Sequence, residues 1–385
     1  MKRVAIVGVG MTSVGEHWGT SLRELAIEAV HKAVEDAQYR KIDALYVGNA
    51  YGGQFNQQTQ LGALLADYVG LRGIEAYTVE AAGASGGVAL RQGLLAVASG
   101  EVRCALVLGV EKATDIVGSA RTKASTVSLD ADYESLHGAT LTGMAGLLMR
   151  RYMHEYGVEL GAFEGFTMNA HANGKVNPYA MYRNTIKAGA FQHAPMVAEP
   201  ISLFDSAPDG DGAAAVLLMA LDSAEDTVSH PIRISGSAMA TDTLALQDRE
   251  HPLTLGAVRT SFERALAQSG KARDDVSFIE MHDAYTVLSA LSLEAMGYSQ
   301  AGEGHQWGAN SGEAIGLKGR LPISTFGGLK SRGNPHGASG VYQAVEATLQ
   351  LRGRAEANQV QGAKVGVIQS IGGLGASVVT HVLEA

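Results

Sequence analysis

Short apolar runs alternate with amphipathic stretches along this chain. Residues 3–9 and 104–110 are continuous apolar runs bounded by glycine or charge, a pattern typical of strands covered on both faces. Residues 21–37 carry apolar side chains on one helical face and charges on the other, and Ser21 with Glu24 has the spacing of a capping box. Strand and helix patterns in alternation predict right-handed βαβ units, and therefore an α/β fold with a largely parallel sheet.

A second helical pattern, at residues 86–99, is apolar or small almost all round. Arg91 and Gln92 are its only strongly polar members. A helix of this kind is usually enclosed by other elements. We therefore expect it to lie between two layers, in a molecule of more than three layers.

The tetrapeptide Gly-Ala-Ser-Gly occurs at residues 83–86 and again at 337–340, and each copy opens a helical pattern. The runs at 232–240 and 364–370 likewise resemble those at the chain start and at 104–110. Repetition of strand and helix patterns predicts two similar α/β halves. The expected divisions are an N-terminal half at 1–120, an insertion with a return to that half at 121–224, and a C-terminal half at 225–385.

Residues 120–200 are rich in Tyr, Met, His and Asn, a composition that fits neither a linker nor a low-complexity segment. It predicts a helical insertion with an irregular surface loop lying over a site. The alternative is a purely structural insertion, which packs against the rest of the molecule and covers no site.

Charge and cysteine content exclude several classes of function. The net charge is −9 and no cluster of Lys and Arg is present, so nucleic acid and anionic membranes are not expected partners. The apolar run near the start is too short for a signal sequence, so a cytoplasmic location is expected. Cys104 is the single cysteine, which rules out an intramolecular disulfide and a cysteine-based zinc site; no metal is expected, and Cys104 is predicted to be a core residue.

Several segments resemble, in order, motifs of the thiolase superfamily. They are VEAAGASGG at 79–87, APMVAEPISLFDSAPDGDGAAAVL at 194–217, HDAY at 282–285, GGLKSRGNPHGASG at 327–340 and SIGGLGAS at 370–377. Each motif alone is weak, but together they span the chain, and the nearest branch is the sterol-carrier-protein type with its archaeal acetyl-CoA acetyltransferase relatives. This resemblance implies a duplicated five-layer αβαβα fold with an inserted loop domain, a homodimer or tetramer, a coenzyme A thioester as substrate, and no tightly bound cofactor.

The resemblance also implies that three reactive positions of thiolases are altered. The position of the acyl-accepting cysteine falls on Gly83, which excludes an acyl-enzyme there. Ser85 is close in sequence, but its hydroxyl is not activated and is a poor replacement. The GHP histidine falls on Asn334, and the second cysteine falls on Ser370.

Other parts of the thiolase site are retained by the same comparison. The backbone N–H groups of Gly83 and Gly372 match an oxyanion hole, and His282 matches the HDxF histidine. His336 is an added titratable group, absent from the usual motif. His282 with Asn334 resembles the histidine and asparagine pair with which initiating ketoacyl synthases stabilise an enolate.

A site with this pair but no thiol is predicted to stabilise a thioester enolate for retro-aldol cleavage or decarboxylation. Loss of the thiol would also leave room, on the order of one or two heavy atoms, for a branched α-carbon. Thiolase-like proteins of sterol side-chain breakdown also lack the cysteine and act with a small OB-fold partner, so an OB-fold or zinc-ribbon partner is a further expectation. They carry tyrosines at the positions of His282 and Ser339, whereas this chain has Tyr285 and Tyr342 in the adjoining segments.

Two alternatives remain at this point. One is a non-catalytic acyl-CoA-binding or scaffold subunit, which the loss of three reactive groups fits directly. The other is an ordinary thiolase in which Gly83 was introduced to trap a ligand, which the changes at Asn334 and Ser370 disfavour.

Overall fold

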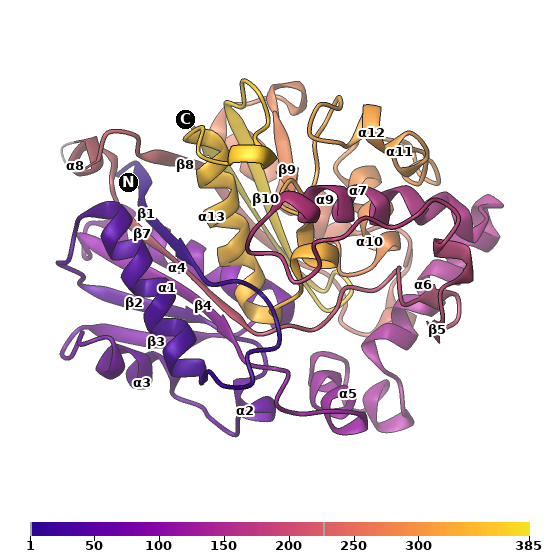
Figure 1. Cartoon of the computed structure of the whole chain (residues 1–385), viewed down its shortest axis with the longest axis horizontal. Helices are drawn as coiled ribbons and strands as arrows, with labels where there is room; N and C mark the ends of the chain where they lie inside the picture. Colours follow the sequence, from indigo (N-terminus) through magenta and orange to yellow (C-terminus); the bar gives the residue numbers. More distant parts are fainter. Residues whose placement is uncertain (1, 226–227) are drawn as a thin grey trace.

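The computed structural model describes residues 2–225 and 228–385, and its strands form a nine-stranded mixed sheet (Figure 1). The sheet has the order β3-β2-β4-β7-β1-β8-β11-β10-β9. Its strands are β1 Val4–Met11, β2 Ala44–Gly48, β3 Glu75–Val79, β4 Cys104–Glu111, β7 Gly212–Ala220, β8 Ile232–Thr241, β9 Phe278–Glu280, β10 Val365–Gly372 and β11 Ser377–Glu384. A separate hairpin pairs β5 Met196–Ala198 with β6 Ile201–Ser202.

The helices lie on both faces of this sheet and over one end of it. They are α1 Leu22–Ala37, α2 Gly52–Phe55, α3 Leu61–Tyr68, α4 Ser85–Ser99, α5 Ser119–Ser125, α6 Leu141–Tyr156, α7 Glu164–Val176, α8 Leu221–Glu225, α9 Gly256–Ser269, α10 Thr286–Ala295, α11 Gln306–Ala309, α12 Ser311–Ala314 and α13 Ser339–Leu351. The capping box of α1 is confirmed, since the Ser21 hydroxyl accepts from the Glu24 N–H at 3.3 Å and the Ser21 N–H donates to the Glu24 carboxylate at 2.7 Å.

The sheet consists of two similar halves that meet where β1 pairs with β8. In the N-terminal half α4 precedes β4, and in the C-terminal half α13 precedes β10. The largely parallel pairing expected from the sequence is wrong, because among the strands that the structure describes only β2–β3, β2–β4 and β9–β10 are parallel pairs. One physical reason is the short turn between β10 and β11, which allows only an antiparallel neighbour.

Helices α4 and α13 pack against each other between the two halves of the sheet (Figure 1). Their first turns approach so closely that a Cβ on Gly86 would lie 2.6 Å from the Gly337 carbonyl oxygen, and one on Gly340 would lie 2.3 Å from the Gly87 nitrogen. The repeated Gly-Ala-Ser-Gly therefore allows two helix starts to meet. With α1 on the outer face of the N-terminal strands and α9 on that of the C-terminal strands, the layers are αβαβα, as predicted.

The core runs through all of these layers. β1 and β4 are buried along their whole lengths, and Cys104 at the start of β4 is fully buried, so its assignment to the core is confirmed. The segment between β4 and β7 contains α5, α6, α7 and the β5–β6 hairpin. Within the described ranges, we find no helix with the length and apolar character needed to span a bilayer.

Candidate functional site

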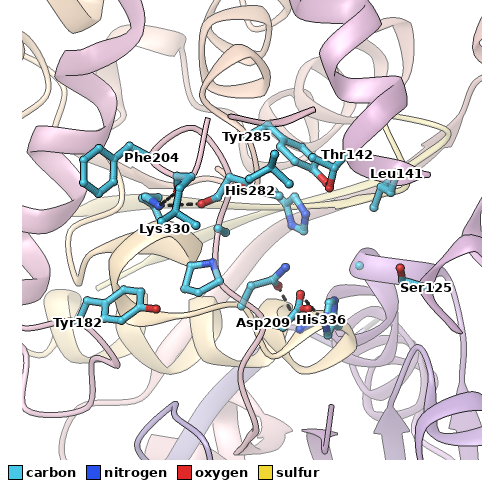
Figure 2. A pocket seen from close by; sticks show the side chains of 18 of the residues that line it. Ser125, Leu141, Thr142, Tyr182, Phe204, Asp209, His282, Tyr285, Lys330 and His336 are labelled. Atoms are coloured by element: carbon cyan, nitrogen blue, oxygen red, sulfur yellow. Dashed lines mark hydrogen bonds and ion pairs between the residues drawn. The ribbon is translucent and has the colours of Figure 1, made fainter. Parts of the chain in front are cut away.

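A cavity of about 870 Å³ lies where the starts of α4 and α13 meet the segment between β4 and β7 (Figure 2). Its volume is in the range of ligand pockets in proteins. Four of the six predicted site residues line it, namely Gly83, His282, Asn334 and His336. Residues from the inserted segment complete the wall, among them Arg121, Thr142, Tyr182 and Lys187.

Gly83 stands in the 3-10 turn that leads into α4, but the space beside it is not vacant. A Cβ on Gly83 would lie 2.6 Å from the Ile371 carbonyl oxygen and 2.9 Å from Cε1 of His282. Both distances are shorter than a Cβ tolerates, so the imidazole occupies the place that a side chain on residue 83 would need. The expected extra room for a branched α-carbon at Gly83 is therefore wrong.

Ser85 turns away from the cavity. Its hydroxyl accepts a hydrogen bond from the Ala81 N–H at 2.9 Å and donates one to the Ala82 carbonyl at 2.6 Å, and the residue is fully buried. These bonds cap the turn before α4, so Ser85 is a structural residue of the helix start.

His282 follows β9 and is held as a neutral imidazole. Burial, helped by the nearby Arg332 and His336 charges, lowers the pKa of His282 to about 3. Nδ1 is buried without a hydrogen-bond partner among the described residues, while Nε2 lies 3.3 Å from the position of a Cβ on Gly83. A neutral imidazole has one N–H to donate, which suits it to stabilise a developing oxyanion without carrying a charge of its own.

The side chain of Asn334 is fixed by two hydrogen bonds to its oxygen. Oδ1 accepts from the His336 backbone N–H at 3.0 Å and from the Ser339 hydroxyl at 3.2 Å. These bonds orient the amide so that its NH₂ group is the part left to act as a donor in the cavity. Asn334 and His282 thus place two neutral donor groups on one cavity.

His336 forms an ion pair with Asp209, whose carboxylate oxygen lies 3.2 Å from Nε2 (Figure 2). Burial alone would lower the pKa of His336, but the contact with Asp209, together with the Glu111 charge, raises it above the ordinary value. Burial opposes ionisation of Asp209 as well, yet the His336 contact holds the pKa of that carboxyl below its usual range. Asp209 was not predicted, although it stands in the quoted segment at 194–217 two residues before Asp211.

Ser370 and Gly372 are not among the residues that line the cavity. The Ser370 hydroxyl is buried and donates to Oε1 of Gln343 at 2.8 Å. Because side chains alternate along a strand, the neighbouring Ile371 is the residue of β10 that faces the cavity, and Gly373 is the next that borders it. The position taken from the resemblance for the second cysteine therefore faces the helix starts instead of the cavity.

Two further polar groups belong to the wall: Lys330, which the sequence analysis missed, and Tyr285, which it noted in the segment adjoining the site. Nζ of Lys330 donates to the carbonyl oxygens of Leu203 at 2.9 Å and Ser206 at 2.7 Å, and burial lowers the Lys330 pKa to about 8. The Tyr285 hydroxyl lies 3.0 Å from that of Thr142. Tyr342, by contrast, hydrogen-bonds to Thr12 in the core and does not reach the cavity.

The cavity holds no thiol, since Cys104 is the single cysteine and is buried in β4. In residues 2–225 and 228–385, no group of three or more His, Cys, Asp and Glu side chains is arranged to hold a metal ion. The chemistry of the wall is therefore that of histidine, asparagine, lysine, tyrosine and aspartate side chains.

Two family models together cover nearly the whole chain. The thiolase N-terminal domain matches residues 4–222, and the thiolase C-terminal domain-like model matches residues 238–385. The chain belongs to the thiolase family. The thiolase family and fold expected from the motifs are thereby confirmed.

Relatives within the thiolase family extend over the full length of the chain. It is 37% identical to the acetyl-CoA acetyltransferase of Methanothermobacter thermautotrophicus over 390 residues, which covers 100% of both proteins. It is 29% identical to the benzoylsuccinyl-CoA thiolase subunit BbsB of Thauera aromatica, covering 94% of this chain and 92% of that one. Human sterol carrier protein 2 is 30% identical, with 99% of this chain and 72% of that protein covered.

Solved structures of thiolase-like proteins have the same fold. The Ltp2-ChsH2(DUF35) aldolase superposes with a TM-score of 0.86 at 24% identity, covering 100% of this chain and 98% of that one. Human mitochondrial 3-ketoacyl-CoA thiolase superposes with a TM-score of 0.77 at 16% identity, covering 100% and 99%. At these identities the likeness concerns the fold alone.

Proposed function

We propose that this protein is an acyl-CoA enzyme that stabilises a thioester enolate and makes or breaks a carbon–carbon bond without an acyl-enzyme intermediate. The observation that carries the proposal is the neutral His282 imidazole, which fills the place of a side chain at Gly83 in a cavity without a thiol. Membership of the thiolase family supports the acyl-CoA substrate class. The acyl group itself is left open.

In this mechanism the substrate carbonyl oxygen accepts hydrogen bonds from His282 and the Asn334 NH₂ group. As the Cα bond breaks, its electron pair moves into the carbonyl and the oxygen becomes an enolate oxygen. Two neutral donors stabilise that negative charge more strongly as it develops. They therefore stabilise the transition state more than the bound substrate, which lowers the activation barrier. The enolate carbon then takes a proton, and the acyl-CoA product is released.

Positive side chains border the cavity, and we propose that they contact the phosphates of coenzyme A. Arg121 and Lys187 both border it, and the guanidinium of Arg121 lies 3.5 Å from the Asp209 carboxylate. Arginine and lysine are the usual partners of phosphate groups in proteins. Of the reactions open to such an enolate we propose retro-aldol cleavage, and a solved structure with the same fold is named an aldolase.

Hydrogen exchange at the substrate α-carbon tests this proposal. Purified protein is mixed with acetyl-CoA in deuterated water, and deuterium in the acetyl group is followed by mass spectrometry. We expect exchange by the native protein and a loss of about 10²-fold in His282→Ala, because one oxyanion donor is removed. His251→Ala, a surface histidine that is 75% exposed, is the matched control and should exchange normally. Exchange that survives His282→Ala would contradict the proposal.

A non-catalytic acyl-CoA-binding or scaffold subunit is the second candidate. It is favoured by the position of Ser370, which cannot act on a ligand in the cavity. Binding of acetyl-CoA measured by calorimetry, with no exchange by the native protein, is the outcome that selects this role.

We also propose that the protein assembles through the edge of its sheet. β3 ends the sheet order, and Tyr77 at its centre is 42% exposed, so this strand is available to pair with a second copy. The name Ltp2-ChsH2(DUF35) joins two proteins, which supports the search for a small OB-fold or zinc-ribbon partner. Sedimentation of the purified protein decides between a monomer, which would refute edge pairing, and a dimer or tetramer.

A further inference from the structure

The pair formed by His336 and Asp209 is not used by the enolate site described above, although both residues line the same cavity. The imidazole is only 11% exposed, while 35% of the Asp209 side chain is open to the cavity. Nε2 is buried and lies 3.2 Å from the carboxylate oxygen, a charge contact that lacks hydrogen-bond geometry. Nδ1 therefore remains as the ring nitrogen able to meet a substrate atom, and Figure 2 shows the pair side by side in the wall.

The backbone around His336 is held in an unusual conformation. Its φ is +39°, a region that a residue with a side chain seldom adopts. Three contacts hold this turn: the His336 N–H donates to Asn334, the Gly337 N–H donates to the Glu111 carboxylate at 3.1 Å, and the Tyr51 ring packs edge-on against the imidazole at 5.1 Å. Backbone strain kept by surrounding contacts is common at functional sites.

Charged and titratable groups face the His336 ring from several elements. Asp209 comes from the loop before β7, Glu111 from the end of β4, Arg121 from α5 and His282 from the loop after β9. The two carboxylates outweigh the single arginine, which agrees with the raised pKa of His336. A histidine oriented by a carboxylate is the arrangement of a general base.

We propose that His336, oriented by Asp209, is the general base for retro-aldol cleavage of a 3-hydroxyacyl thioester in this cavity. The proton of the 3-hydroxyl passes to Nδ1, and the O–H electron pair forms the new C=O bond. The C2–C3 bond breaks, and its electrons become the enolate that His282 and Asn334 stabilise. The imidazolium then returns the proton to C2, which gives a shortened acyl-CoA and an aldehyde or ketone with all atoms and charges balanced.

This inference rests on the proposed function and narrows its substrate class. Decarboxylation has no hydroxyl proton to remove, so a base beside the carbonyl donors favours a substrate that carries a 3-hydroxyl. Asp209 acts through His336 and is a positioning residue, while His336 is the residue expected to touch the substrate.

Cleavage assays with Asp209→Asn and His336→Gln test the pair. The probes are synthetic 3-hydroxyacyl-CoA thioesters, with secondary and tertiary C3 atoms, and the readouts are the shortened acyl-CoA and the trapped carbonyl product. We expect kcat to fall about 10²-fold or more in both variants with KM little changed, because a general base contributes that much to a rate. Asp132→Asn, an exposed aspartate, and His251→Gln are the matched controls.

The pH profile gives a readout that a purely structural role would not move. The base must be unprotonated, so kcat of the native protein should fall as the pH drops below the raised pKa of His336. In Asp209→Asn the fall in the residual kcat should move to a lower pH, because the carboxylate that favours the imidazolium of His336 has been removed. Asp209→Glu should restore part of the rate.

The outcomes distinguish the general-base proposal from the proposed enolate site. Normal cleavage by Asp209→Asn and His336→Gln, with cleavage lost in His282→Ala, overturns the base and leaves the enolate site standing. Failure of the native protein both to exchange acetyl-CoA protons and to cleave any thioester of the panel overturns both. Unfolding curves of the variants serve to exclude a folding defect as the cause of lost activity.

Discussion

Gly83→Ala perturbs the contact on which the proposed function depends. The glycine does not have a positive φ, so alanine meets no backbone penalty and the change reports on sterics alone. The new methyl group would be 2.6 Å from the Ile371 carbonyl oxygen and 2.9 Å from Cε1 of His282, whereas ordinary contacts begin at 3.4 Å. The carbonyl belongs to β10 and cannot move alone, so relief of both contacts requires the turn at Gly83 to move back and the imidazole to shift.

The cost of that shift has a thermodynamic and a kinetic part. Forcing a methyl group into a filled site costs about 1–3 kcal/mol. Replacing glycine also restricts the unfolded chain, which returns about 0.4–1 kcal/mol. A net loss of about 0–2.6 kcal/mol is expected, and displacement of His282 by a fraction of an ångström should slow α-proton exchange by about 10- to 100-fold.

Urea unfolding and deuterium exchange measure the two parts separately. Gly312→Ala is the control for stability, since a Cβ there meets nothing within 4 Å and the residue has no positive φ. Gly83→Cys should be destabilised in the same way and should form no acyl adduct when incubated with acetyl-CoA. A Gly83→Ala protein with native stability and native exchange would refute the conclusion that His282 occupies this space.

Two further substitutions test the placement of buried groups. Ser370→Ala should leave α-proton exchange unchanged while lowering the free energy of unfolding by about 1–3 kcal/mol, because it deprives Gln343 of a buried donor; loss of exchange would return Ser370 to the active site. His381 is fully buried, and burial lowers its pKa to about 4, below the 6.5 of the unfolded chain. The contribution of the neutral imidazole to the free energy of unfolding is therefore complete above pH 6.5 and is lost as the pH falls toward 4. Urea unfolding at several pH values should therefore show a smaller acid destabilisation in His381→Gln, by about 3 kcal/mol, and an unchanged pH dependence would contradict this.

Much of the fold was predictable because its signals are local. The apolar runs at 3–9 and 104–110 became β1 and β4, and the apolar helix at 86–99 became α4 between two layers. The tetrapeptide repeat marks the two helix starts that meet, because close helix packing demands small residues at both. Strand direction was not predictable, since it depends on which distant strand supplies each neighbour.

The candidate site was predictable only where a motif fixes both the residue and the direction in which its side chain points. His282, Asn334 and His336 stand in short loops beside the cavity, so their presence there follows from the motifs. Ser370 stands in a strand, where an alignment uncertain by a single residue assigns the wrong face, and Ile371 faces the cavity instead. The contact of Asp209 with His336 joins segments far apart in the chain, so no local sequence pattern predicts it.

The two histidines of the cavity lie in opposite electrostatic environments, and this difference assigns their roles. Arg332 acts with burial to keep His282 neutral, whereas Asp209 and Glu111 favour the protonated form of His336. Groups in one site with pKa values pushed apart divide acid–base work between them. A neutral imidazole can donate to an enolate oxygen throughout the reaction, and an imidazole paired with a carboxylate can take a proton and return it. Exchange of these roles would require His282 to become charged beside a buried arginine, which the site disfavours.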